Sequence, residues 1–205
     1  VYRWLREQIH AGAFGRIYAF DGDYLYGRLQ KITGGWRKDV ENYSVVQGGG
    51  IHMADLMLWL TGEKPVSVTA AGNRISTEGT AFRYHDFVSA VYRFPSGLIG
   101  RISSNFGCVH RHQHVVRVFG TMATFLCDDQ GPRVYRTREP EQPAELLVES
   151  PLPKNKWDLI PPLLEAIRRG EDSSDAAQRE FDLAGVCFAA DKAARTGWPE
   201  EIEYV

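Results

Sequence analysis

Residues 48–62 read GGGIHMADLMLWLTG and place one helix at the centre of the expected fold. This apolar run, closed by Gly62, predicts a helix from about Gly50 to Thr61. Projected at 3.6 residues per turn, its apolar side chains cover most of the helix circumference. We therefore expect this helix to be buried all round.

Two polar side chains interrupt the apolar helix. His52 and Asp55 stand three residues apart on one face, near Trp59. One interpretation is a structural pair that satisfies its own hydrogen bonds. The other is catalytic, because an imidazole with an ordinary pKa of about 6.5 can take a hydroxyl proton reversibly while a secondary alcohol is oxidised. Asp55 would then orient the imidazole or bind a neighbouring substrate hydroxyl.

The segment before this helix predicts a strand followed by a loop. Residues 16–26 carry aromatic side chains on one parity and acidic ones on the other, which indicates a strand with two chemically distinct faces. The aromatic set is Tyr18, Phe20, Tyr24 and Tyr26, and the acidic set is Asp21 and Asp23. Residues 29–47 lack clear periodicity and are typical of a long functional loop.

The strand and the loop supply candidate ligand-binding side chains. Trp36 and Arg37, with Tyr24 and Tyr26, could offer aromatic faces to the C–H surface of a sugar and a guanidinium to its hydroxyl groups. The alternative for the tyrosines is a sheet face buried against another subunit, since large aromatic side chains also dominate interfaces.

The segment after the helix predicts a sheet. Short strand patterns follow one another at residues 66–71, 86–94, 98–105, 114–120, 133–136 and 145–148. The sequence Pro95-Ser96-Gly97 joins two of them as a tight turn, and such turns connect antiparallel neighbours. The fold class is therefore α+β, with an open, mostly antiparallel sheet and flanking helices.

Two helices are expected near the end of the chain, at about residues 158–169 and 176–195. Asp175 and Gln178 resemble a capping box for the second helix. The apolar stripe of that helix is predicted from its spacing to be Phe181, Ala184, Phe188 and Ala194. Residues 201–205 could return as a last strand.

Composition narrows the class of protein. The 205 residues are read as one domain, with 24 basic and 26 acidic side chains, which gives no sign of a nucleic-acid partner. No apolar run approaches the roughly 20 residues that a membrane span needs. Cys108, Cys127 and Cys187 are too scattered for a disulfide framework, so a cytoplasmic location is expected.

Half of the histidines alternate along one segment. His110, His112 and His114 would project from one face of a strand, where a metal site is conceivable. Solvent-facing histidines at the end of a strand are at least as common, so no metal is predicted. A substrate-binding role is expected instead, and His112 is the candidate.

The stretch from Gly50 to Asp55, followed by LWLTG at residues 58–62, resembles the C-terminal half of the Gfo/Idh/MocA oxidoreductase family, which includes glucose-fructose oxidoreductase and inositol 2-dehydrogenase. The segments at residues 12–18, 116–121 and 195–199 are similar as well. In that family the motif is Asp-x-Gly-x-His-x-x-Asp, and here Gly50, His52 and Asp55 match it. The first Asp of the motif falls on Gly48.

The resemblance implies a domain like the C-terminal domain of dihydrodipicolinate reductase. It implies a substrate-side domain, residues 1–205, of an enzyme that transfers hydride between NAD or NADP and a sugar or polyol. His52 and Asp55 would be catalytic, Trp59 would contact substrate, and Gly49 and Gly50 would lie against the cofactor.

No G-x-G-x-x-G fingerprint occurs in the chain, and it does not begin with Met. We therefore expect the dinucleotide-binding domain to lie upstream and the 205 residues to be inactive alone. Glu63-Lys64-Pro65 spells the family's lysine motif, but after the His52 helix, where it is a coincidence. Two other functions stay open: a non-catalytic module that forms homo-oligomers through the sheet face, and a NAD-dependent glycoside hydrolase domain.

Overall fold

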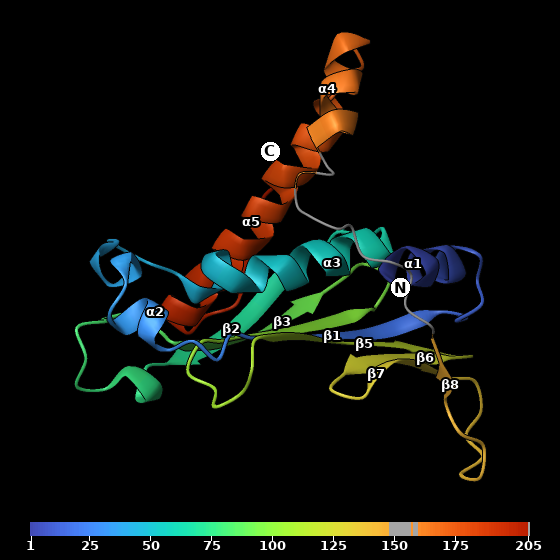
Figure 1. The fold of residues 1–205 in the computed structure, drawn as a ribbon, viewed down its shortest axis with the longest axis horizontal. Coiled ribbons are helices and arrows are strands. Elements are labelled where there is room, and N and C mark those ends of the chain that lie inside the picture. Colours follow the sequence, from blue (N-terminus) through green and yellow to red (C-terminus); the bar gives the residue numbers. More distant parts are fainter. Residues whose placement is uncertain (148–156, 158–159, 205) are drawn as a thin grey trace.

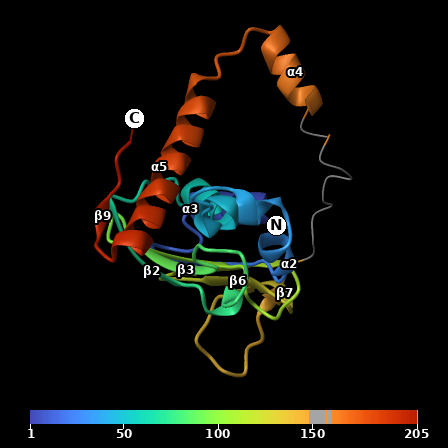
Figure 2. The ribbon, with the colours of Figure 1, turned by 90° about the vertical axis from the view of Figure 1, so that its left-hand side faces the viewer.

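A computed structural model describes residues 1–147, 157 and 160–204. They form one open sheet, and the α-helices that pack on it lie on a single face, while the helix of residues 160–168 projects away from the sheet (Figure 1, Figure 2). The described strands are β1 (Ile17–Leu25), β2 (Ser67–Asn73), β3 (Phe87–Arg93), β4 (Ile99–Asn105), β5 (Gln113–Gly120), β6 (Thr124–Asp128), β7 (Gly131–Tyr135), β8 (Glu145–Leu146) and β9 (Glu200–Glu201). Their order across the sheet is β8-β7-β6-β5-β1-β4-β3-β2-β9.

The predicted class, α+β with a mostly antiparallel open sheet, is confirmed. Neighbouring strands are antiparallel, except that β1 runs parallel to β4. The turn at residues 95–97 joins β3 to β4 as expected, with Gly97 at φ 87°. The short strand β6 was not predicted, because its five residues show no clear alternation of apolar and polar side chains. Residues 148 and 205 of two predicted strands, and residues 158 and 159 of the helix predicted at 158–169, lie outside the described residues.

The structure describes five α-helices and three shorter helical turns, some of which fall within the predicted loop. They are α1 (Tyr2–His10), α2 (Gln30–Thr33), α3 (Ile51–Thr61), α4 (Ile160–Arg168) and α5 (Ser174–Thr196), with 3-10 turns η1 (Trp36–Asp39) and η3 (Ile75–Thr77) and a π-helical turn η2 (Val46–Gly50). The prediction of a continuous loop over residues 29–47 is therefore wrong, since α2, η1 and η2 fall within it. None of the helices in the described part of the chain is long and apolar enough to cross a membrane.

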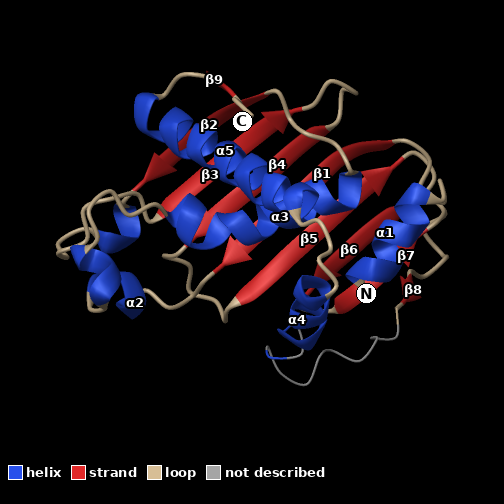
Figure 3. Ribbon diagram, turned by 90° about the horizontal axis from the view of Figure 1, so that it is seen from above, coloured by secondary structure: helices blue, strands red, loops and turns tan. Residues whose placement is uncertain are grey.

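The helix predicted from residues 48–62 is α3, and Gly62 ends it in the left-handed conformation at φ 70°. It lies across the middle of the sheet (Figure 3), where glycines of the strands make room for it. Met57 sits over Gly100 of β4, and a Cβ at Gly22 of β1 would lie 3.0 Å from the Cβ of Met53. The missing side chains let helix and sheet approach closely enough to bury both methionines.

Helix α5 packs on β2 and β3 through a different face from the predicted one. Its buried side chains are Asp182, Leu183, Val186, Cys187, Ala189, Ala190 and Ala193. Phe181 and Phe188 are instead 61% and 58% exposed, so the predicted stripe is wrong. Small side chains let the helix lie close to the sheet. The capping box is also wrong, because Asp175 lies inside the helix and its N-cap Ser173 forms no side-chain cap hydrogen bond.

The described helices leave the second face of the sheet uncovered (Figure 2). Asp23 of β1 accepts hydrogen bonds there from Ser103 at 2.6 Å, Arg101 at 3.1 Å and Arg117 at 2.9 Å. Arg101 also donates to Asp21 at 3.2 Å. Burial alone would raise the pKa of Asp23, but these donors together lower it. We call these five side chains the charged network of the open face.

Candidate functional site

Helix α3 exposes one side to solvent, and the candidate catalytic residues lie on it. His52, Asp55 and Trp59 are exposed, whereas Met53 and Met57 are buried. The prediction that the helix is buried all round is therefore wrong, because this side of α3 is turned away from the sheet and its side chains stay partly open to solvent. The imidazole of His52 is reachable by a ligand.

His52 belongs to a cluster of rings where the start of α3 meets β1 and β5. Its ring centroid lies 5.6 Å from that of Tyr24 and 5.7 Å from that of His114. Tyr24 stacks on Tyr26 at 5.9 Å, and His112 lies 5.3 Å from His114 and 5.4 Å from Tyr26. We call Tyr24, Tyr26, His52, His112 and His114 the imidazole cluster.

The two tyrosines form the floor of this cluster. Tyr24 is 4% and Tyr26 is 8% exposed, and Phe106 packs against both rings at 5.7 and 4.6 Å. Their face of β1 is covered by the chain's own helices. The alternative in which this aromatic face meets another subunit is therefore wrong, and the uncovered face is the acidic one. Tyr18 departs from the pattern and is 50% exposed, beside an irregularity in the β1–β5 pairing.

The surroundings keep two imidazoles of the cluster neutral. Burial, followed by the nearby His112 and His52, lowers the pKa of His114 to about 4. Burial, followed by Arg28 and His52, also lowers the pKa of His112. A neutral imidazole offers one donor and one acceptor. The buried Nε2 of His114 has no hydrogen-bond partner among the described residues.

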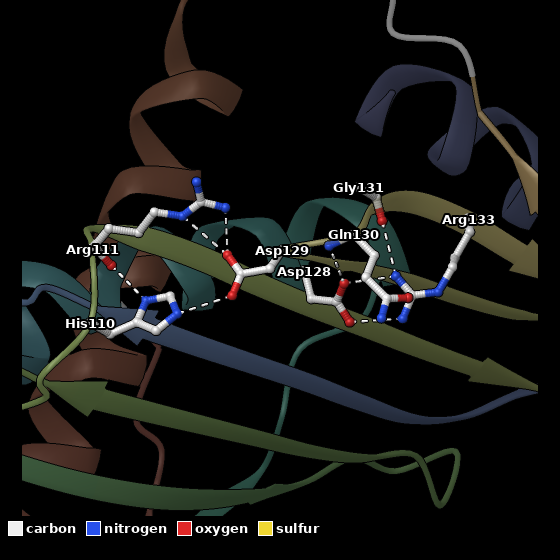
Figure 4. Close-up of polar contacts among 7 residues, drawn as sticks. All are labelled: His110, Arg111, Asp128, Asp129, Gln130, Gly131 and Arg133. Carbon is white, nitrogen blue, oxygen red and sulfur yellow. Dashed lines mark hydrogen bonds and ion pairs between the residues drawn. The ribbon is translucent and has the colours of Figure 1, made fainter.

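His110 lies apart from the imidazole cluster. Strand β5 begins only at Gln113, so His110 lies in the preceding loop, and the prediction of three histidines on one strand face is wrong. His110 and Arg111 both bind Asp129 of the β6–β7 turn, at 3.1 and 2.5 Å, beside the Asp128–Arg133 pair (Figure 4). The carbonyl of Arg111 and the carboxylate of Asp129 raise the pKa of His110. Within the described residues, no group of three His, Cys, Asp or Glu side chains could hold a metal ion.

Two guanidinium groups lie at the edge of the cluster. Arg28 lies over the ring of Tyr26 at 5.6 Å. Arg37 lies over Trp36 at 4.6 Å, and its Nε donates to the hydroxyl of Tyr43 at 3.1 Å. Burial raises the pKa of Tyr24, an effect that Arg28 and Arg37 both oppose. Arg37 is therefore near the cluster, while the indole of Trp36 is 64% exposed beside it.

Sequence reasoning missed Arg28, Tyr43 and His114 as members of this site. Arg28 continues the parity of Tyr24 and Tyr26, which could have indicated it. The positive φ of Gly27, 57°, turns the chain where the strand ends. No comparable signal existed for Tyr43, which reaches the site from a loop.

Asp55 and Trp59 border a separate hollow of about 450 Å³ between α3 and α5. Arg6 of α1 donates to the Trp59 carbonyl at 2.9 Å and lies over its indole at 5.2 Å. Burial, then the nearby Glu180, raises the pKa of Asp55, while His52 and Arg179 oppose the rise. No hydrogen bond joins His52 to Asp55 in the described structure. His52 does not line this hollow, so His52 and Asp55 lie in different, neighbouring environments.

The three glycines before His52 pack against the chain itself. A Cβ at Gly49 would overlap Tyr24 and lie 2.8 Å from Phe106, and a Cβ at Gly50 would overlap Ser104. A Cβ at Gly48 would overlap the hydroxyl of Tyr43. The phenol of Tyr43 thus fills the space beside position 48, where the family resemblance places a carboxylate.

Lys64 has a structural partner. Its ammonium group pairs with the carboxylate of Asp182, whose side chain is only 4% exposed, and lies 5.0 Å from the ring of Tyr204. This ion pair links the end of α3 to α5.

Comparison with solved structures identifies the fold. The aldose-aldose oxidoreductase from Caulobacter crescentus, complexed with glycerol, is 21% identical with a TM-score of 0.76, covering 98% of this chain and 60% of that one. Levoglucosan dehydrogenase in complex with NADH is 17% identical with a TM-score of 0.78, covering 98% and 62%. Myo-inositol 2-dehydrogenase from Lactobacillus plantarum is 17% identical with a TM-score of 0.73, covering 98% of this chain and 61% of that one. The chain thus spans about three fifths of each of these proteins.

No curated protein gives a significant match to the chain. The family model of the GFO/IDH/MocA C-terminal domain matches residues 2–126, which is more than half of the chain. These residues include β1, α3 and the imidazole cluster. The chain therefore belongs to the Gfo/Idh/MocA oxidoreductase family and corresponds to its C-terminal domain.

Proposed function

We propose that residues 1–205 are the substrate-side domain of an oxidoreductase that exchanges hydride between a nicotinamide cofactor and a sugar or polyol. Family membership supports the class of reaction. The observation that carries the proposal is the exposed His52 imidazole, held above Tyr24 and beside His114. Without a dinucleotide-binding domain the 205 residues would be inactive.

The proposed role of His52 is to take the hydroxyl proton as the secondary alcohol becomes a carbonyl, and to return it in the reverse direction. A positioned side chain of this type contributes roughly 10²- to 10⁴-fold to a rate. The rings of Tyr24 and His114 limit where the imidazole can lie, so that it stays aligned with the substrate. Asp55 stands one turn further along α3 and borders the hollow between α3 and α5, so it would bind another hydroxyl group of a substrate that extends from His52 into that hollow.

The remaining predicted residues would bind different parts of the substrate. His112 and Arg37 would donate hydrogen bonds to substrate oxygens, and the exposed indoles of Trp36 and Trp59 would cover its C–H surface. Tyr24 and Tyr26 are buried, so we assign them to holding the imidazoles in place, with only their edges available to a ligand.

NAD or NADP would be bound mainly by a separate dinucleotide-binding domain, since this chain has no G-x-G-x-x-G fingerprint. When bound, the nicotinamide would accept or supply the hydride. The expected contribution of Gly49 and Gly50 to the cofactor site would be indirect, because both glycines are buried against Tyr24, Phe106 and Ser104 and let η2 pack closely on the sheet. The proposed location of the enzyme is the cytoplasm, where its three cysteines stay reduced.

The proposal is tested in the enzyme that joins this chain to a dinucleotide-binding domain. His52→Ala should lower kcat for polyol oxidation by at least about a hundredfold, because general-base catalysis is lost. Reduction of the nicotinamide, followed by its absorbance, measures the rate. His10→Ala, which removes an exposed imidazole on α1, is the control and should keep the wild-type rate. Near-normal turnover in His52→Ala would remove this residue from the mechanism.

A second proposed function is assembly through the open face of the sheet. The observation that favours it is the charged network, in which two arginines and two aspartates neutralise one another where no described helix covers the strands. Such a face can be buried against a copy of itself without leaving unpaired charges. Both functions are compatible in one domain.

A further inference from the structure

We propose that the substrate of this site is an acidic sugar or polyol, whose carboxylate or phosphate group binds between Arg28 and Arg37. This inference rests on the proposed function, because it names the class of substrate that His52 would act on.

The first support is the charge of the segment that borders the imidazole cluster. Residues 28–39 contain four basic side chains, Arg28, Lys31, Arg37 and Lys38, and a single acidic one, Asp39. The whole chain has a formal net charge of -2, so this is a local excess of positive charge. Lys38 pairs with Asp39 at 2.5 Å. The single carboxylate of this segment is thus already paired with a lysine.

The second support is that both guanidinium groups lack an anionic partner. Among the described residues, neither Arg28 nor Arg37 forms an ion pair with a carboxylate, whereas Arg101, Arg111, Arg117 and Arg133 all do. Arg28 rests on the ring of Tyr26, and Arg37 is held by the Tyr43 hydroxyl. Stacking and a single neutral acceptor leave most of the five N–H donors of each guanidinium available for a planar anion.

The third support is that the imidazole cluster itself contains no carboxylate that would repel an anionic substrate. Burial lowers the pKa of His112 and of His114, whose rings lie 5.3 Å apart, and neither imidazole can carry a negative charge at neutral pH. At position 48 the phenol of Tyr43 fills the space in which a carboxylate would repel an anion. The nearby Asp55 faces Arg179 and Glu180 of α5. A neutral sugar would leave both guanidiniums without the charged acceptor that they match best.

The experiment compares substrates that differ in charge, using the enzyme that joins this chain to a dinucleotide-binding domain. The neutral probes are D-glucose and xylitol, and the anionic probes are D-gluconate, D-glucuronate and glucose 6-phosphate. We expect kcat/KM to be at least about tenfold higher for the best anionic probe, because one charge-assisted hydrogen bond is worth about that factor. Comparing the two carboxylate probes with the phosphate probe shows which of these anionic groups the site prefers.

The variants Arg28→Gln and Arg37→Gln should lower kcat/KM for the preferred anion by about 10- to 100-fold more than for the neutral probes. Arg3→Gln, which removes an exposed guanidinium on α1, is the matched control for net charge and should leave the ratio unchanged. If the variants raise KM for the cofactor while the substrate ratio stays constant, the anion is a cofactor phosphate and the inference is overturned.

The two proposals fail in different ways. Oxidation of neutral probes with equal or higher kcat/KM overturns the acidic substrate and leaves the proposed function standing. If none of the probes, neutral or anionic, gives reduction of either nicotinamide cofactor, the proposed function falls and the acidic substrate falls with it.

Discussion

Burial of the His114 ring makes the stability of the folded chain depend on pH. Its pKa is about 4 in the folded chain, against 6.5 for an unperturbed histidine. As the pH falls from about 6.5 to about 4, His114 becomes protonated in the unfolded chain but stays neutral in the folded chain. The contribution of His114 to the free energy of unfolding is therefore complete above that window and is lost as the pH falls through it.

We predict that His114→Phe flattens this dependence. The loss in free energy of unfolding between about pH 7 and about pH 4.5 should be smaller in the variant by about 1 kcal/mol, a value discounted because the ring is only half-buried. Denaturant titrations of both proteins at the two pH values measure it. His10→Phe controls for the removal of an imidazole from an exposed position. Parallel pH profiles for wild type and His114→Phe would contradict the assignment.

At the scale of elements, the glycines before α3 decide how closely the π-helical turn approaches the sheet. A methyl group at Gly49 would overlap the Tyr24 ring and press on Phe106. We predict that Gly49→Ala destabilises the fold by about 1–3 kcal/mol, the usual range for overpacking. Gly34→Ala is the matched control, because a Cβ there would meet only the Gln30 carbonyl at 3.4 Å, and it should change stability by less than about 0.5 kcal/mol.

Thermal unfolding of the two alanine variants, together with cofactor binding in the joined enzyme, separates packing from ligand contact. A stable Gly49→Ala protein that has lost cofactor affinity would show that this glycine leaves room for a ligand and not for Tyr24. Lost stability with unchanged affinity would assign it to packing alone.

Elements whose signals are local were predictable from the sequence. Gly62 at the end of α3 and the turn at residues 95–97 depend on a few residues with special backbone conformations, and both were confirmed. The face of α5 was not predictable in the same way. Phe181 and Phe188 are the most apolar choice, yet small side chains let the helix approach β2 and β3, and this depends on the shape of the partner layer.

The candidate site shows the same division. His52 and Asp55 were found because two polar residues interrupt an apolar helix. His114 was set aside in favour of His112, since burial of one imidazole beneath its neighbours depends on rings contributed by β1, β5 and α3 together. Arg28 shares the parity of Tyr24 and Tyr26, but its position over the Tyr26 ring also depends on the turn at Gly27, which the strand pattern alone does not predict.

At the scale of the whole molecule, the sheet has one face covered by helices and one face left open (Figure 2). The centre of the open face is already neutralised, and the side chain of Asp23 there is only 15% exposed. Val91 of β3 lies beside this network, since its Cα pairs with that of Arg101. Val91 is therefore an apolar side chain on the open face, next to a network whose charges are already paired, so burial of this region would leave no charge without a partner.

We therefore predict that the chain self-associates through this face and that Val91→Lys prevents it. In a monomer the long lysine stem can carry its ammonium group into water, whereas under a second copy that charge would be desolvated beside Arg101. Because a buried charge without a partner costs several kcal/mol, association should weaken by at least about a hundredfold. Light scattering over a dilution series measures the molar mass, and circular dichroism checks that the variant is folded. Ile75→Lys, at a 69% exposed side chain in the 3-10 turn η3 outside the strands, is the control and should associate like wild type. A wild-type chain that stays monomeric over the series, or a Val91→Lys variant that still associates, would contradict assembly through the open face.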